Sequence, residues 1–187
     1  MKGVVMRAAM IAMLILLLPA ALFAGPSMGV YFTYTPAQMH YSPVQFEEFN
    51  GYIFAQGAEG CLLTGVEFRV QMPSGISIDS FTVADGGLSM GSPASGISVA
   101  FWPPLDGSYP GYNLIGTLHL FASRGCVGTN PIKDAPMRIV AHPVTGHIYG
   151  SCLPDNELFD FAGLTSIICP ELVGTEDKSW GAIKSLF

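Results

Sequence analysis

Apolar and polar residues alternate strictly from Val66 to Met72, which is the clearest pattern in the chain. Successive side chains of an extended strand point to opposite faces, so this alternation predicts a strand with one buried and one solvated face. The side chains expected inside are Val66, Phe68, Val70 and Met72, and those expected outside are Glu67, Arg69 and Gln71. Cys61 opens this stretch and a turn at 72–75 closes it, so we expect the strand to order the sheet on its neighbours.

Similar apolar runs recur at short intervals, separated by Gly and Pro residues that favour turns. Strands are expected over residues 28–34, 76–84, 96–102, 114–121, 137–142, 148–152 and 164–169, with two pieces in 44–54 and an edge piece at most over 88–90. An irregularity is expected at Asp79 and Ser80, and a hairpin across 143–146. Eight to ten short strands with frequent turns predict an all-β fold, an antiparallel β-sandwich.

Three of these runs resemble the core strands of cohesin-like domains, which are immunoglobulin-like bacterial sandwiches of about nine strands. The runs are LTGVEFRV at 63–70, GISVAF at 96–101 and LIGTLHL at 114–120, so the resemblance covers about a third of the chain. It implies a jelly-roll sandwich used for extracellular binding or assembly, and no residues of a dockerin-binding surface can be matched. The Trp-Gly-x-Ile-Lys-Ser-Leu tail is also similar to small exported bacterial proteins of unknown function.

The first two dozen residues have the pattern of a cleaved signal peptide, here assigned to 1–24. Lys2 and Arg7 give a basic start, residues 8–18 are uninterruptedly apolar, and small residues follow. Cleavage after Ala24 is the first choice, and cleavage after Ser27 is the alternative. The apolar run is shorter than the roughly 20 residues of a membrane span, so we expect no span in the mature protein; a membrane-anchored form is the alternative.

Removal of this segment leaves six basic residues against fourteen acidic ones, a formal charge of −8. A chain without a basic patch lacks the phosphate attraction that dominates nucleic-acid binding, so a nucleic-acid partner is excluded. The same charge argues against docking on anionic lipid. The sandwich domain is expected over residues 25–172, followed by a spacer and tail over 173–187.

Four cysteines follow the signal peptide: Cys61, Cys126, Cys152 and Cys169. An even number in an exported protein predicts two disulfides, for which three connectivities are possible. We expect Cys61 to pair with Cys126 and Cys152 with Cys169; the main alternative joins Cys126 to Cys152. The cysteines lie far apart and no C-x-x-C pair occurs, so a zinc site does not fit the spacing.

The sequence carries no recognisable catalytic or metal-binding constellation, and we predict a protein that is not an enzyme and uses no cofactor or metal. No H-E-x-x-H or S-x-x-K motif occurs. His142 and His147 form the closest histidine pair but lack a third ligand, and His119 is expected to be hydrogen-bonded and partly buried. The acidic cluster in 155–160 lacks the EF-hand order and is expected to be a solvated turn, with calcium binding as the alternative.

An aromatic loop over residues 102–112 is the first candidate binding site. Trp102, Tyr109 and Tyr112 lie there among Pro and Gly residues that stiffen or turn the backbone. Exposed rings on a rigid loop can stack on sugars or anchor a protein partner. The alternative is that Trp102 caps the core and the tyrosines pack along the loop.

The C-terminal tail is the second candidate binding site. Trp180, Ile183 and Leu186 recur at three-residue spacing behind polar capping residues, which predicts a short amphipathic helix. Such a helix is too short to be stable alone, so it must dock on its own sandwich or on another molecule.

These features predict a secreted, periplasmic or cell-surface module that mediates protein–protein association in the cell envelope or extracellular matrix. Its expected partner is a protein or glycan of the envelope or matrix. A carbohydrate-binding module that uses Trp102, Tyr109 and Tyr112 is the alternative function, and a hydrolase is the third.

Overall fold

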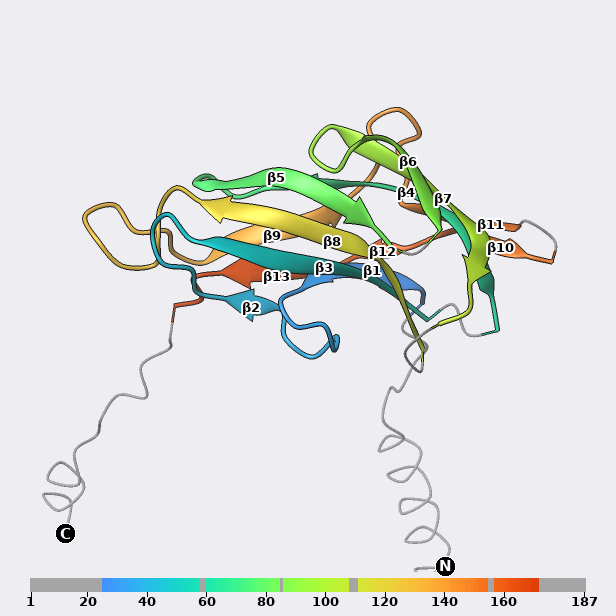
Figure 1. Ribbon diagram of the computed structural model, residues 1–187, viewed down its shortest axis with the longest axis horizontal. Coiled ribbons are helices and arrows are strands. Elements are labelled where there is room, and N and C mark those ends of the chain that lie inside the picture. The colour runs from blue at the N-terminus through green and yellow to red at the C-terminus, as the bar shows by residue number, and fades with distance from the viewer. Residues whose placement is uncertain (1–24, 58–59, 85, 108–110, 155–156, 172–187) are drawn as a thin grey trace, which may run out of the picture.

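The computed structural model describes residues 25–57, 60–84, 86–107, 111–154 and 157–171. These residues form two β-sheets packed face to face, and no helix occurs among them (Figure 1). None of the described segments therefore forms a helix long and apolar enough to cross a membrane. The proposed signal peptide and the C-terminal tail lie outside the described residues.

The first sheet has the strand order β12-β1-β3-β8-β5. Its strands are β1 (Ser27–Tyr31), β3 (Glu48–Gln56), β5 (Ile76–Val83), β8 (Tyr112–Ala122) and β12 (Ala162–Gly163). Strand β8 lies between β3 and β5, as expected of the central strand predicted over 114–121. The pairing of β5 with β8 shifts register between Ile78 and Ser80, which confirms the irregularity expected there.

The second sheet has β4 at its centre. Its main path is β11-β10-β4-β9-β13-β2, and β7 pairs with the other edge of β4 and with β6. The strands are β2 (His40–Tyr41), β4 (Leu62–Gln71), β6 (Gly87–Ser92), β7 (Gly96–Leu105), β9 (Ala135–Val140), β10 (Tyr149–Leu153), β11 (Glu157–Asp160) and β13 (Thr165–Ile168). The opening alternation thus lies on the strand that organises this sheet.

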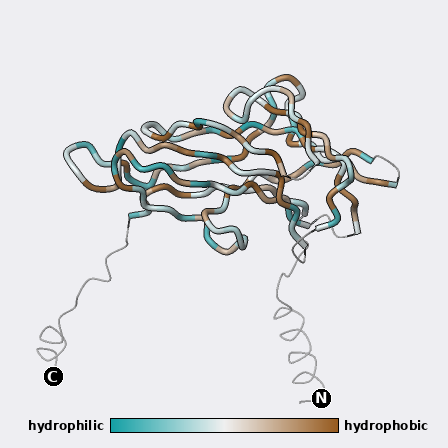
Figure 2. Tube along the Cα trace, in the orientation of Figure 1, coloured by the Kyte–Doolittle hydropathy of each residue, from teal (hydrophilic) through white to brown (hydrophobic). Residues whose placement is uncertain are grey.

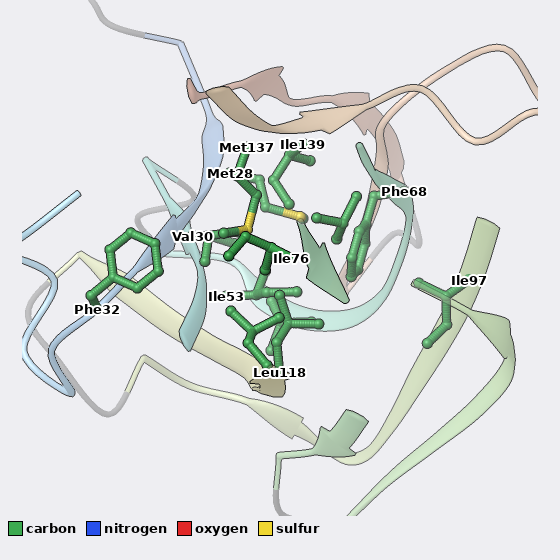
Figure 3. Packing of buried hydrophobic residues seen from close by; sticks show 14 of the residues in the cluster. Met28, Val30, Phe32, Ile53, Phe68, Ile76, Ile97, Leu118, Met137 and Ile139 are labelled. Carbon is green, nitrogen blue, oxygen red and sulfur yellow. The ribbon is translucent and has the colours of Figure 1, made fainter. Parts of the chain in front are cut away.

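The predicted faces of β4 are confirmed. Val66, Phe68 and Val70 are buried, whereas Glu67 and Arg69 are half-buried and Gln71 is exposed. Figure 3 shows Met28, Val30, Ile53 and Leu118 of the first sheet meeting Phe68, Met137 and Ile139 of the second in one core. Apolar and polar segments alternate along the strands over the whole sandwich (Figure 2).

The hairpin expected across residues 143–146 is wrong. Strands β9 and β10 do not pair with each other: β9 pairs with Arg69–Gln71 and β10 with Leu62–Glu67, so both lie along β4. They act as two parts of one interrupted strand, and residues 141–148 loop out between them. Pro143 cannot donate to a ladder, which is one reason for a break there, and the loop is closed by hydrogen bonds between the backbones of His142 and His147 and of Gly146 and His142.

Several strand limits also differ from the expectation. Residues 48–56 form one strand with a register shift between Ile53 and Phe54 in place of two separate pieces, because a bulge absorbs the irregularity. The edge piece expected over 88–90 is a full partner of β7 over 87–92. Strand β7 continues to Leu105, since an edge position near its end tolerates Pro103 and Pro104.

All four cysteines form disulfides, but the expected pairing is wrong. The bridges are Cys61–Cys152 and Cys126–Cys169, the one connectivity that was neither the first choice nor its main alternative. Because β10 runs beside the start of β4, Cys152 lies opposite Leu63 and within reach of Cys61. Cys126 is instead joined to the residue that follows β13.

Candidate binding groove

A groove lies on the outer face of the second sheet, over the strands β6, β7, β4, β10 and β11. These strands lie together at the right-hand end of Figure 1. The groove encloses about 860 Å³. Residues that face each other on neighbouring strands point to the same side of a sheet, so the strand registers define how the groove is built.

The floor of the groove is a row of small residues. Ala100 of β7 lies opposite Gly65 of β4, and Gly65 lies opposite Ser151 of β10. A Cβ atom at Gly65 would lie 3.1 Å from the carbonyl oxygen of Val99 and 3.2 Å from Ser151 Oγ, so a larger side chain at this position would require these neighbours to give way by a few tenths of an ångström. The hydroxyls of Thr64 and Ser151 lie 2.8 Å apart and bridge β4 to β10.

The walls of the groove are large aliphatic side chains on its two outermost strands. The floor row ends at Leu88 of β6 and at Leu158 of β11. Leu88 is 79% exposed, Met90 beside it is 76% exposed and Leu158 is 65% exposed. Thr145 in the loop between β9 and β10 also lines the groove. The floor is therefore bordered by apolar groups that no other described part of the chain covers.

The next row along the sheet is polar except for Met90 at its β6 end. It runs through Met90, Ser98, Glu67, Tyr149 and Asp160. Ser98 Oγ donates a hydrogen bond of 3.0 Å to Glu67 Oε1. Beside it, the His147 ring stacks on Tyr149 at 4.5 Å between centroids, and its Nδ1 lies 3.0 Å from Asp160 Oδ1. The carboxylate of Glu67 thus lines the groove, and that of Asp160 lies beyond Tyr149 at the end of the same row.

The aromatic residues expected to bind are placed on different sheets. Trp102 is 81% exposed and follows Ala100 by two residues on β7, so it extends the outer face that carries the groove. Tyr112 is half-buried at the start of β8 and makes edge-to-face contacts with Tyr31 and Phe54. Tyr109, Trp180, Ile183 and Leu186 lie outside the described residues, so the aromatic loop and the tail stay predictions.

Outside the groove, the described histidine and carboxylate side chains form no group that could hold a metal ion. His119 is half-buried and its Nε2 lies 3.0 Å from Thr82 Oγ1, which confirms the hydrogen-bonded position expected for it. Within residues 25–171, apart from the undescribed gaps, no group of three or more His, Cys, Asp or Glu side chains could hold a metal ion. Burial and the neighbouring Tyr112 raise the pKa of Tyr31, which lies on the first sheet and not in the groove.

The groove-wall residues were not found from the sequence. Leu88 and Met90 lie two apart in a short apolar run, which is the signal of a strand with an apolar outer face, yet the run was assigned to an edge piece at most. Leu158 lies within residues 155–160, which the sequence pattern predicts to be a solvated acidic turn, whereas residues 157–160 form strand β11. Gly65, Ala100 and Ser151 lie side by side in the groove floor only because β4 pairs with β7 and with β10.

No protein-family model matches the chain, and no curated protein matches it. The sixth cohesin of scaffoldin B from Acetivibrio cellulolyticus is 11% identical, with a TM-score of 0.52 over 79% of this chain and 99% of the cohesin. The third ScaB cohesin of R. flavefaciens is 12% identical, with a TM-score of 0.51 over 79% of this chain and 96% of the cohesin.

The chain has a cohesin-like fold. The resemblance noted in residues 63–121 thus extends to the sandwich as a whole. The A. cellulolyticus cohesin was solved in complex with a mutant Cel5 dockerin and the R. flavefaciens cohesin with a group 1 dockerin. At these sequence identities the likeness concerns the architecture, and the chemistry of the groove comes from the residues of this chain.

Proposed function

We propose that the protein is an exported, non-catalytic module that binds a protein partner in the groove. The observation that carries the proposal is the exposure of Leu88, Met90 and Leu158 around a floor of small residues. Contiguous exposed apolar surface is costly in water and marks interaction sites on soluble proteins. The two cohesins of similar fold, solved with dockerins, support a role in protein–protein association.

The dimensions of the groove suit an α-helix of the partner. Strands β6 and β11 are four strand spacings apart, about 19 Å, and a helix with its side chains is about 10–12 Å wide. Gly65 and Ala100 allow a close approach to the floor, while Leu88 and Leu158 contact the flanks of the helix. A partner helix with an apolar stripe, and with a basic residue near Glu67 and Asp160, is complementary to this surface.

Trp102 extends this surface along β7. Exposed tryptophans are enriched among the residues that dominate the affinity of protein interfaces, and Trp102 lies on the same face as Ala100. A carbohydrate-binding role for Trp102, Tyr109 and Tyr112 remains the alternative. A glycan array on which Trp102→Ala loses no signal would count against this alternative.

Export is supported by two independent features. The first 24 residues have the signal-peptide pattern, and all four cysteines are paired in disulfides, which persist in oxidising compartments. We therefore propose a secreted, periplasmic or cell-surface location. Protein sequencing of the mature N-terminus tests this directly, with residue 25 or 28 as the expected first residue.

The decisive experiment compares partner capture by the wild type and by Ala100→Arg. An arginine at the floor fills the groove and adds a charge, whereas Val127→Arg adds the same side chain at an exposed site between β8 and β9. Purified dockerin modules are tested by calorimetry, beginning with those bound by the two cohesins. Secreted and envelope proteins of the host are tested by affinity capture.

The expected result is a partner whose Kd rises at least tenfold with Ala100→Arg and stays unchanged with Val127→Arg. Both variants should keep the wild-type circular dichroism spectrum. Retention of the partner by Ala100→Arg, or the absence of any selectively retained protein, would contradict the proposal.

The C-terminal tail is proposed to contribute to docking through Trp180, Ile183 and Leu186. Removal of residues 175–187 should abolish association with envelope or matrix material and leave the sandwich folded. Normal association of the truncated protein would show that the tail is not needed for binding.

A further inference from the structure

The C-terminal tail, residues 172–187, has the sequence pattern to which the groove is complementary. The tail lies outside the described residues, so its pattern is taken from the sequence. Trp180, Ile183 and Phe187 recur at spacings of three and four residues, and the predicted helix presents them as one apolar stripe. A helix over residues 178–187 is about 15 Å long. It needs an apolar surface of another element to be stable.

The charges of the tail and the groove are also complementary. The described residues that line the groove include one carboxylate, Glu67, and no Lys or Arg. Two of the six basic residues that follow the signal peptide, Lys178 and Lys184, belong to the tail. Lys184 follows Trp180 by four residues, so both lie on the same side of the predicted helix. A helix that lays its stripe on the groove floor therefore brings an ammonium group close to Glu67.

The described chain ends at the opposite end of the sandwich from the groove. The backbone N–H of Glu171 donates a hydrogen bond to Asp134 Oδ1, and Asp134 directly precedes β9. Strand β13 ends at the left-hand end of Figure 1, whereas the groove strands lie at the right-hand end. The tail thus starts far from the groove of its own chain.

The strand registers give the size of this separation. Arg138 of β9 lies opposite Gln71 of β4. Asp134 is four residues farther toward the end of the sandwich, and Gly65 is six residues away in the other direction. Ten strand rises separate the two levels, about 33 Å.

The tail is barely long enough to cover this distance within one chain. The residues from 172 to 177 span at most about 22 Å when fully extended, and Ile183 lies about 9 Å farther along the predicted helix. The stripe would reach Gly65 of its own groove only with a fully extended spacer, which costs conformational entropy. The groove of a second copy imposes no such extension.

We propose that the groove of one copy binds the C-terminal tail of a second copy, so that the protein self-associates. This inference rests on the proposed function, because it names the partner of the same groove. The stripe of Trp180 and Ile183 lies on the floor formed by Gly65 and Ala100, and Lys184 pairs with Glu67. Each copy offers one groove and one tail, which is a head-to-tail contact between different surfaces.

The test combines two variants of the full mature chain that damage opposite partners of the contact. Ala100→Arg fills the groove and keeps the tail, whereas Ile183→Asp places a carboxylate in the stripe and keeps the groove. Val127→Arg is the matched control, since Val127 is exposed and does not line the groove. Sedimentation velocity over a range of concentrations measures the mass of each protein and of an equimolar mixture of the two variants.

The wild type and Val127→Arg should reach the mass of two or more copies as concentration rises. Ala100→Arg and Ile183→Asp should each stay monomeric alone. Their mixture should form a species of two copies and no larger one, because it holds one intact type of contact: the tail of the first variant in the groove of the second. Formation of this species also shows that both variants are folded.

Two outcomes overturn the inference: the wild type stays monomeric at every concentration, or the mixture of variants does not associate. The failure of the inference is distinguishable from that of the proposed function. If the wild type is monomeric and Ala100→Arg still loses a captured protein, the groove binds a different partner. If Ala100→Arg self-associates like the wild type and also keeps every captured protein, both proposals are wrong.

Discussion

The outer faces of the two sheets distribute small and large side chains differently. On the second sheet, the middle of the row is small and its ends are large: Leu88, Ala100, Gly65, Ser151 and Leu158. On the first sheet, rings occupy the β1 and β3 positions of the row and hydroxyls the β8 and β5 positions: Tyr31, Tyr52, Thr117 and Thr82. The outer face of the second sheet is hollowed along its strands, whereas that of the first sheet has a hollow beside residues 103–107.

Both faces arise from the same two-residue alternation. Alternation decides which side chains enter the core, but it does not decide which outward side chains become neighbours. That depends on register, because a residue acquires its lateral neighbours from strands distant in sequence. Gly65 gives a floor only because Ala100 and Ser151 lie on either side of it.

Phe68→Ala should have the largest effect, because it removes the core that supports both faces. Phe68 is fully buried between the sheets, and truncation of a buried phenylalanine costs about 3–5 kcal/mol of unfolding free energy. Urea denaturation of Phe68→Ala and of Gln71→Ala measures the difference, since Gln71 lies on the exposed face of the same strand. Gln71→Ala should stay within about 0.5 kcal/mol of the wild type. A loss below 1 kcal/mol for Phe68→Ala would refute its core position.

Removal of each disulfide in turn should show that partner affinity depends on the bridge beside the groove and not on the bridge at the other end of the sandwich. Replacing Cys61 and Cys152 together by alanine, or Cys126 and Cys169 together, should each cost about 2–4 kcal/mol. The first bridge ties β4 to β10, which form the groove floor, and the second lies beyond β13. Partner affinity measured under native conditions should therefore fall for the first pair and hold for the second. Equal affinity losses would show that the groove does not depend on the local bridge.

Substitutions at the groove floor should separate two effects: loss of space for the partner and loss of unfolding free energy. Gly65→Val places atoms against Val99 and Ser151, and such overpacking costs about 1–3 kcal/mol. Ala100→Leu projects from an exposed position on the same row, so its unfolding free energy should change by less than about 0.5 kcal/mol. Both should weaken partner binding. If Ala100→Leu binds normally, the partner does not reach the floor.

The sequence was sufficient for the core and for the class of fold. Burial of one face needs only local alternation, so the inward residues of β4 and β7 could be assigned without knowing their neighbours. The bulge in β5 could be assigned in the same way, because Asp79 and Ser80 interrupt an apolar run. Both predictions depend on residues that are adjacent in sequence.

Pairing could not be predicted in this way. The hairpin over 137–152 assumed that sequential strands pair, but β4 is long enough to take both β9 and β10 along one edge. The disulfide assignment failed for the same reason, since Cys152 reaches Cys61 only when β10 lies beside β4. The groove combines residues from several strands, so it was not visible in any single segment.

The smallest expected effect is a change in stability at alkaline pH, and it depends on Tyr41 in β2. Removal from water, a hydrogen bond of 2.7 Å to Glu47 Oε1 and the charge of Glu47 raise the pKa of Tyr41 from 10.0 to about 12. An unfolded chain loses this phenol proton near pH 10, whereas the folded protein keeps it to about pH 12. The stabilisation is therefore complete below pH 10 and is lost as the pH rises through 12.

Tyr41→Phe should flatten this alkaline part of the stability profile. Tyr41 is only half-buried, so solvent screening keeps the effect below about 1 kcal/mol. The urea midpoints of the wild type and of Tyr41→Phe, measured between pH 8 and pH 12, test this effect. Only pH values at which both disulfides stay intact are compared. Because Tyr41 is not among the residues that line the groove, partner binding there should be the same for both proteins at pH 8. A steeper alkaline loss in Tyr41→Phe than in the wild type would reverse the sign and refute the assignment.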